Sequence, residues 1–352
     1  MHRSLIVVLL SLLLVTGPAP AATSAARDAA ILRGLAWIEA HPASREDGGF
    51  RDLVDEALFH LVTRDLPRPA GAPAAAPARR RALGRLAAAL QSGTPGDGLL
   101  DHYHRLLALH LLELAGRSPP RRAALLDAAR TALAQPQRAN PAVRLAVAVL
   151  LARLGARSPL DPRRLLPGSF AWRIAHAGGG QVLPTALRGH PYLYYALVHE
   201  IAVLTDFGRL PPPAWMARGR ALLLAVLREG LALTRASGNR DLLAELLLSW
   251  HILRGDPQAP AVQRALDDLV ASQQADGSWG RQTPHRDNAL RHAVQTATAA
   301  LLVFRPRTAG GRVDSGGDVP PAPSSPPHAS TSDSRSPSGE QGRGEGDAPA
   351  GL

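Results

Sequence analysis

Two side chains that could take part in proton transfer stand seven residues apart in one predicted helix. His199 and Asp206 fall two turns apart on one face of the helix expected over 187–206, and Tyr192 and Tyr195 lie within about 60° of that face. An imidazole oriented by a carboxylate can act as a general base, which makes His199 and Asp206 the candidate catalytic pair. The alternative is structural: a buried histidine bonded to a neighbour, with an ordinary helix end around Asp206.

Polar residues gather on one side of other predicted helices as well. An aliphatic stripe lies opposite His292 and Gln295 in 287–304, and 51–64 has a polar side of its own. We expect these polar sides to face a shared hollow, although they could be turned outward or only satisfy one another. The candidate ligand-binding residues are Tyr192, Tyr195, His251, His292, Gln295, Asp52 and Glu56.

Metal and cofactor motifs are not found. The pair His199-Glu200 lacks the second histidine of a zinc-protease motif, because Val203 stands there. Three glycines at 178–180 lack the lysine of a phosphate-binding loop, and no dinucleotide fingerprint or Gly-x-Ser-x-Gly elbow occurs. We therefore expect no cofactor and assign no metal site, although His199 and Asp206 could share a metal with His251 or His292.

The elements that must position these residues are all predicted to be helices. Apolar residues recur with helical period between breaks rich in Gly, Pro or Asn, and no convincing strand pattern occurs. The expected helices are 27–40, 51–64, 78–91, 99–115, 121–134, 141–154, 187–206, 212–234, 239–254, 260–274 and 287–304. Helix pairs that recur about every 40–50 residues indicate a helical repeat architecture.

A short signature occurs near both ends of this helical region. Arg264-Ala265 and Leu269-Val270 precede a turn with Gln274, Gly277 and Trp279; Arg33-Gly34 and Trp37-Ile38 precede one with Gly48, Gly49 and Phe50. In both, a glycine turn, which allows a positive φ, delivers an aromatic residue. The signature resembles the glutamine–tryptophan repeat of terpenoid cyclases and, more loosely, the Gly-Gly-Phe repeat of protein prenyltransferase β-subunits. The resemblance implies an α/α toroid of about five to six helical hairpins. A plain helix-to-helix turn would also explain it, so it supports a fold and not an activity.

The activities of families that share this fold depend on residues that are missing here. The chain has no cysteine, which removes the zinc ligand of prenyltransferases and lanthionine cyclases and the thiol of thioester domains. Terpene cyclisation is not expected either, because aromatic residues make up only 4% of the chain and Asp267-Asp268 belongs to a predicted outer helix.

The two ends of the chain differ in composition from its middle. Residues 1–22 are expected to be a secretory signal, with a basic start, an apolar run over 5–15 and small residues at 19–21. That run is too short to span a bilayer, so the mature, exported chain is not expected to cross a membrane. Residues 306–352 are rich in Pro, Ser and Gly and are expected to be disordered. The helical domain is therefore placed at 23–305.

The net charge of +11 comes entirely from arginine, because the chain contains no lysine. Export argues against a nucleic-acid partner, so an anionic envelope surface is the more natural one. Two functions stay open. The first is a non-catalytic, exported toroid that binds a ligand or partner in its central cavity. The second is a hydrolase or lyase of envelope glycans that uses His199 and Asp206.

Overall fold

The computed structural model describes residues 22–44, 49–92, 98–119, 121–135, 140–177, 190–279 and 287–305. Within these ranges the structure consists of α-helices, one 3-10 helix and connecting turns, with no strand. The predicted all-helical class is thus confirmed for the described part of the chain. Residues 1–21 of the expected signal and the expected tail, 306–352, lie outside it, as does Gly48.

The helices begin and end close to the predicted positions. They are α2 (Ser24–Ala40), α3 (Gly49–Val62), α4 (Ala75–Ser92), α5 (Leu99–Leu114), α6 (Arg122–Ala134), α7 (Pro141–Arg153), α8 (Pro162–Leu165), the 3-10 helix η1 (Leu166–Gly168), α9 (Phe170–His176), α10 (Pro191–Leu204), α11 (Ala214–Arg218), α12 (Arg220–Ser237), α13 (Arg240–Ile252), α14 (Pro260–Ser272) and α15 (Asp287–Val303).

Two regions differ from the prediction. The helix expected over 212–234 is divided into α11 and α12 at Gly219, where a Cβ atom would lie 2.4 Å from the Cβ of Ala175. The short helices α8 and α9 were not predicted, because four and seven residues are too few to show a helical period. Their N-termini are instead marked by capping side chains, with Asp161 before α8 and Ser169 before α9.

Six helices follow one another through direct contacts. α3 contacts α5, α5 contacts α7, α7 contacts α10, α10 contacts α13, and α13 contacts α15. The last of these helices, α15, also contacts the first, α3, although the two are far apart in the sequence. We call these six the inner helices.

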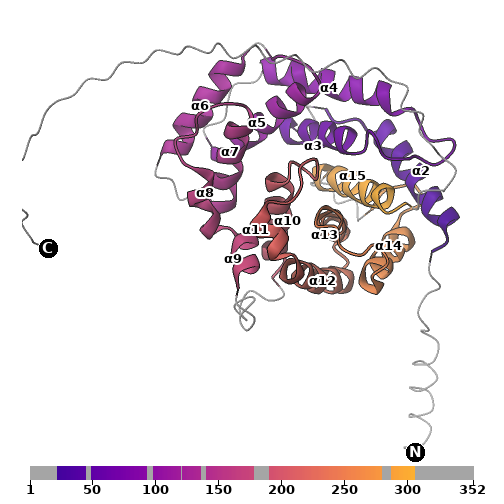
Figure 1. Ribbon diagram of the computed structural model, residues 1–352. Coiled ribbons are helices and arrows are strands. Elements are labelled where there is room, and N and C mark those ends of the chain that lie inside the picture. The colour runs from indigo at the N-terminus through magenta and orange to yellow at the C-terminus, as the bar shows by residue number, and fades with distance from the viewer. Residues whose placement is uncertain are drawn as a thin grey trace, which may run out of the picture. The chain divides into compact units, whose positions relative to one another are not determined.

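The remaining long helices pack on the sides of the inner ones. α4 contacts α3 and α5, α6 contacts α5 and α7, and α12 contacts both α10 and α13. α14 contacts α13, and α2 contacts α15. In Figure 1 these helices lie outside the inner helices, with α4 and α6 beyond α3 and α5, and α12 and α14 beyond α13.

The first and last described helices meet at a buried tryptophan. The side chain of Trp279 is fully buried, and its Nε1 donates to the carbonyl oxygen of Leu269, 2.6 Å away. A Cβ atom at Gly34 would lie only 3.2 Å from the Trp279 ring and 2.3 Å from Oγ1 of Thr298. Gly34 therefore lets α2 approach α15 and the turn after α14 closely.

The glycines of the signature adopt the backbone conformation for which they were singled out. Gly49 has a φ of +73° at the start of α3, and Gly277 has a φ of +92° in the turn before Trp279. At Gly277 a Cβ atom would also lie 2.5 Å from the carbonyl oxygen of Arg33. Phe50 packs against the core, whereas the side chain of Gln274 only donates to the carbonyl oxygen of Ser272.

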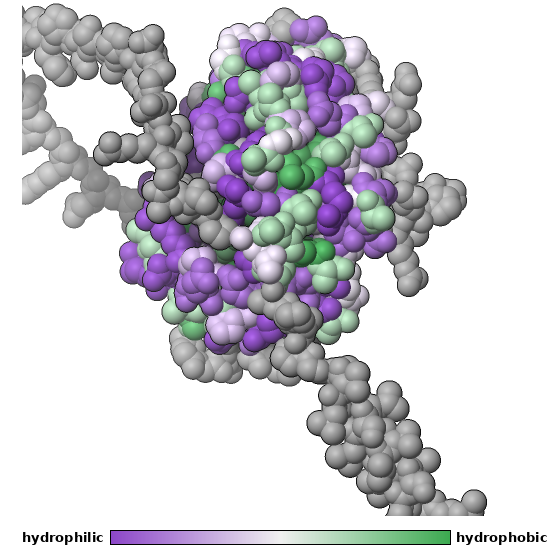
Figure 2. Space-filling model, turned by 90° about the vertical axis from the view of Figure 1, so that its right-hand side faces the viewer, coloured by the Kyte–Doolittle hydropathy of each residue, from purple (hydrophilic) through white to green (hydrophobic). Residues whose placement is uncertain are grey.

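The face of the structure drawn in Figure 2 is mixed in polarity. Hydrophilic residues cover much of this face, and hydrophobic residues lie among them, mainly along its middle. Among the described residues, none of the helices is long and apolar enough to cross a membrane. Large exposed hydrophobic side chains are few in the same residues, and two of them, Leu100 and Tyr192, line the cavity described next.

Candidate functional site

A cavity of about 1200 Å³ lies among the inner helices, and all six contribute to its wall. Most of the wall is apolar, with Leu58 and Val62 from α3, Leu107 from α5 and Leu248 from α13. The cavity is open to solvent, because Leu100, one of its lining residues, is 53% exposed. An open, mainly apolar cavity of this size is large enough for an organic ligand.

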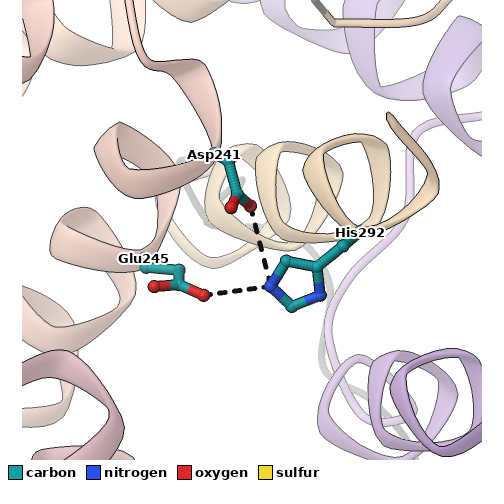
Figure 3. Close-up of side chains that lie close together, drawn as sticks. All are labelled: Asp241, Glu245 and His292. Carbon is teal, nitrogen blue, oxygen red and sulfur yellow. Dashed lines mark hydrogen bonds and ion pairs between the residues drawn. The ribbon is translucent and has the colours of Figure 1, made fainter. Parts of the chain in front are cut away.

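Polar groups from four inner helices meet at one part of this wall. His292 on α15 lies at their centre: its Nε2 is 3.0 Å from Oε1 of Glu245 and 3.6 Å from Oδ1 of Asp241. On its other side, Nδ1 is 3.3 Å from Oδ2 of Asp55. Figure 3 shows Asp241 and Glu245 on α13 pointing together toward the imidazole of His292. We call Asp55, His199, Asp241, Glu245 and His292 the polar cluster.

His199 joins the cluster from α10. Its Nε2 lies 3.4 Å from the same Oε1 of Glu245 that His292 approaches, so a single carboxylate oxygen faces two imidazoles. The side chain of His199 is 55% exposed, although it sits among the many protein atoms around the cavity. It is therefore the member of the cluster that a ligand in the cavity can reach most easily.

The pKa directions describe a network of ion pairs. Burial disfavours the charged form of His292, but Asp55 and Asp241 outweigh it and raise the pKa of the imidazole well above its usual value. For His199 burial again opposes protonation, and Glu245 overcomes it to raise the pKa. Burial alone would raise the pKa of Glu245, yet the two histidines bring it below its usual range. Glu245 is thus held as a carboxylate between two histidines that tend to carry a proton.

Asp241 behaves differently from the other carboxylates. Burial and the neighbouring charge of Glu245 raise its pKa, against the opposing effect of His292. Hydroxyl groups fix its orientation: Tyr195 Oη donates to Oδ2 at 3.2 Å, and Thr296 Oγ1 donates to Oδ1 at 3.2 Å. Two carboxylates one helical turn apart on α13 therefore differ in their tendency to ionise.

Some polar atoms of the wall have no hydrogen-bond partner in the structure. The Oε2 of Glu245 is buried and unpaired, and the whole residue is only 8% exposed. Both amide atoms of Gln295 are buried and unpaired as well, in a residue that is 3% exposed and lines the cavity. A buried polar group without a partner costs free energy, so these atoms mark places where a ligand could bind favourably.

The predicted pair of His199 and Asp206 is not formed, which corrects the sequence analysis. Because α10 ends at Leu204 and Asp206 has a φ of +52°, its carboxylate leaves the helical face that carries His199. Its Oδ1 lies 2.7 Å from Nε2 of His110 and 3.3 Å from Nη1 of Arg153, so the buried Asp206 carboxylate is held in an ion-pair network. Asp206 itself does not line the cavity, although Arg209, which pairs with its Oδ2 at 3.1 Å, does. The glycan-acting enzyme stays a prediction, but without Asp206 as the orienting carboxylate.

Asp52 and Glu56 do not line the cavity either, although the polar side of α3 suggested that they would. Asp52 accepts from Arg291 at 2.6 Å, which ties α3 to α15. Glu56 accepts from Arg85 at 2.6 Å and from the backbone N–H of Ala43 at 2.9 Å. Both carboxylates are nearly fully buried, so they serve as ties between helices.

The other predicted ligand-binding residues do share one cavity. Its wall includes Tyr192, Tyr195, His251, His292 and Gln295, together with His199, the other predicted catalytic residue. Sequence reasoning missed Asp55, Asp241 and Glu245. The spacing of Asp241 and Glu245, one helical turn apart near the start of a predicted helix, was a signal available for two of them.

Comparisons with known proteins identify a family but no activity. A family model described as a domain of unknown function, DUF6895, matches residues 57–305. This range covers most of the chain and includes every helix that contributes to the cavity, with only the first part of α3 before it. No curated protein and no solved structure matches the chain.

Proposed function

The chain belongs to the DUF6895 family, whose description assigns no function, and from the site itself we propose that it binds a small amphipathic ligand in its central cavity. The observation that carries the proposal is the division of the cavity wall into a large aliphatic part and one polar cluster. An apolar body would lie against the aliphatic part, and a polar head would meet His199 and Glu245.

The character of the polar head follows from the charges of the cluster. Three carboxylates face two histidines, and Arg51 Nε lies 3.5 Å from Oδ2 of Asp55, so three negative groups are balanced by up to three positive ones. A neutral head that exchanges hydrogen bonds with these groups therefore fits the site. Gln295, with both amide atoms unpaired, offers a donor and an acceptor on the same wall.

The proposal includes the architecture and the location predicted from the sequence. We interpret the inner and outer helices as an α/α toroid, and the return contact between α15 and α3 supports this. Export through the segment at 1–22 would bring the cavity to ligands of the cell envelope, and the arginine-rich exterior would favour an anionic envelope surface.

A neutral fluorescent probe tests whether the cavity binds apolar ligands. N-phenyl-1-naphthylamine fluoresces strongly only in apolar surroundings, and we expect saturable binding to the full chain. Ala202 lies on the cavity wall, so Ala202→Trp should fill part of the cavity and weaken binding at least about tenfold, roughly 1.4 kcal/mol. The readout is a fluorescence titration, with far-UV circular dichroism to show that each variant keeps its helices.

A matched control separates filling of the cavity from the mere addition of a tryptophan. Ala124 lies exposed on α6 and does not line the cavity, so Ala124→Trp should leave the affinity unchanged. The proposal fails if the unmodified chain shows no saturable binding, or if Ala202→Trp and Ala124→Trp bind the probe equally well.

A further inference from the structure

Three members of the polar cluster are arranged as ligands of a metal ion would be. One ligand atom from each of Asp241, Glu245 and His292 can be chosen so that all three lie within 4.8 Å of one another. Ligand atoms held about 2.1 Å from zinc in a tetrahedral site lie about 3.4 Å apart, close to the observed separations of 3.0 and 3.6 Å. We propose that a divalent transition-metal ion binds between Asp241, Glu245 and His292.

The neighbours of these residues are those that metal ligands require. When the Nε2 of a histidine binds a metal, its Nδ1–H usually donates to a carboxylate, which fixes the orientation of the ring. Asp55 lies on that side of His292 as an ion-pair partner, with its Oδ2 3.3 Å from Nδ1, although Nδ1 forms no hydrogen bond in the structure. Asp241 is likewise oriented, by the hydroxyl groups of Tyr195 and Thr296.

A separate observation points to an ion rather than to a closed network of ion pairs. The Oε2 of Glu245 is buried and has no hydrogen-bond partner, although Glu245 itself is more than nine-tenths buried. Oε1 is the oxygen that points toward His292 (Figure 3), so an ion between the three residues would bind Oε1, and bidentate binding by the carboxylate would also give Oε2 a partner. Gln295 lines the same cavity and is also buried, and neither its amide nitrogen nor its amide oxygen has a hydrogen-bond partner.

The donor set indicates the class of ion. Two carboxylates and one imidazole, without a thiolate, suit Zn²⁺ and its first-row neighbours better than Cu⁺ or Ca²⁺. His199, whose Nε2 lies 3.4 Å from Glu245 Oε1, is close enough to offer a fourth ligand from the cavity side. Since Glu245 and His292 line the cavity, the ion would be reachable from it.

Binding of the metal alone tests the inference. The full chain, carrying no purification tag of histidines and treated with a chelator, is titrated with Zn²⁺ by calorimetry and with Co²⁺ by visible absorption. We expect about one ion per chain and a Co²⁺ spectrum that Zn²⁺ abolishes. Glu245→Gln and His292→Asn should each weaken binding at least 100-fold. Asp55→Asn, which alters a neighbour of His292 and none of the three ligands, should weaken it about 10- to 100-fold.

A control substitution is available at Asp52, which lies on α3 like Asp55 but outside the polar cluster. Asp52→Asn alters the buried ion pair with Arg291 between α3 and α15, so it should lower stability and leave metal affinity unchanged. The inference is overturned if the unmodified chain binds neither ion, if Glu245→Gln and His292→Asn bind as it does, or if Asp52→Asn loses binding equally. Because the neutral probe reports the cavity without the metal, retained probe binding would then leave the proposed ligand function standing.

Discussion

Glu245 is the residue on which the candidate site depends most. It faces two histidines from different inner helices, lies one turn from a second carboxylate and keeps one buried oxygen unpaired. A buried carboxylate is unfavourable unless cations or donors surround it. The two imidazoles supply most of that compensation here, which explains why Glu245 stays ionised despite its burial.

Another buried glutamate, Glu200, predicts a dependence of stability on pH. Burial raises the pKa of Glu200 to about 7, even though it accepts from the backbone N–H groups of Phe170 and Ala171 at the start of α9. A carboxyl group with a raised pKa in the folded state stabilises the fold below its unfolded pKa, near 4.5, and this contribution is lost as pH rises through about 7.

Glu200→Gln should remove this dependence, because the amide cannot ionise but still offers an oxygen to α9. Between pH 5 and 8 the unmodified chain should lose up to about 3 kcal/mol of unfolding free energy relative to the variant. Urea unfolding of both proteins at the two pH values measures the difference. Equal slopes of stability against pH in the two proteins would contradict the account.

At the scale of the elements, the sequence predicted the long helices well and the faces of those helices less well. The spacing of apolar residues predicted α10, α13 and α15 to within a few residues of their ends. Tyr195, His199, His292 and Gln295 line the cavity, as expected. The assignment was wrong for α3. Asp55, which was not chosen, lines the cavity, whereas Asp52, three residues earlier, pairs with Arg291. Residues 60° apart on one helix can serve different neighbours, and periodicity alone does not say which neighbour is where.

The partner of His199 could not have been predicted for a related reason. The distance from His199 to Asp206 along an ideal helix suggested a pair, but the helix ends before Asp206 and the turn redirects it toward His110 on α5. Glu245 replaces it from α13, which lies more than forty residues away in the sequence. Such a contact depends on which helices pack together, and the sequence of a single helix does not specify its neighbours.

The turn between α14 and α15 should be the most sensitive to substitution. Trp279→Ala would empty a fully buried site and remove the bond to Leu269, so it should cost about 3–5 kcal/mol of unfolding free energy. Trp172 is only partly buried and stacks on His176, so Trp172→Ala should cost less than half as much. The midpoints of urea unfolding compare the two, and equal losses would show that Trp279 has no special role in joining the ends of the domain.

For the whole molecule, the contact of α15 with α3 and the approach of α2 to α15 at Gly34 bring the two ends of the described helices together. That arrangement places side chains from four inner helices around one part of the cavity. The central claim is therefore that His199 and His292, ninety-three positions apart in the sequence, face the same ligand-accessible space.

Histidine side-chain spectra test this claim most directly. Long-range ¹H–¹⁵N correlation spectra of the labelled chain, assigned with His199→Gln and His292→Gln, are recorded as N-phenyl-1-naphthylamine is added. The resonances of His199 and His292 should shift together along one binding curve, whereas His41 and His176, stacked on tryptophans outside the cavity, should not move. Binding of the probe that shifts His41 or His176 and leaves His199 and His292 unchanged would contradict the account.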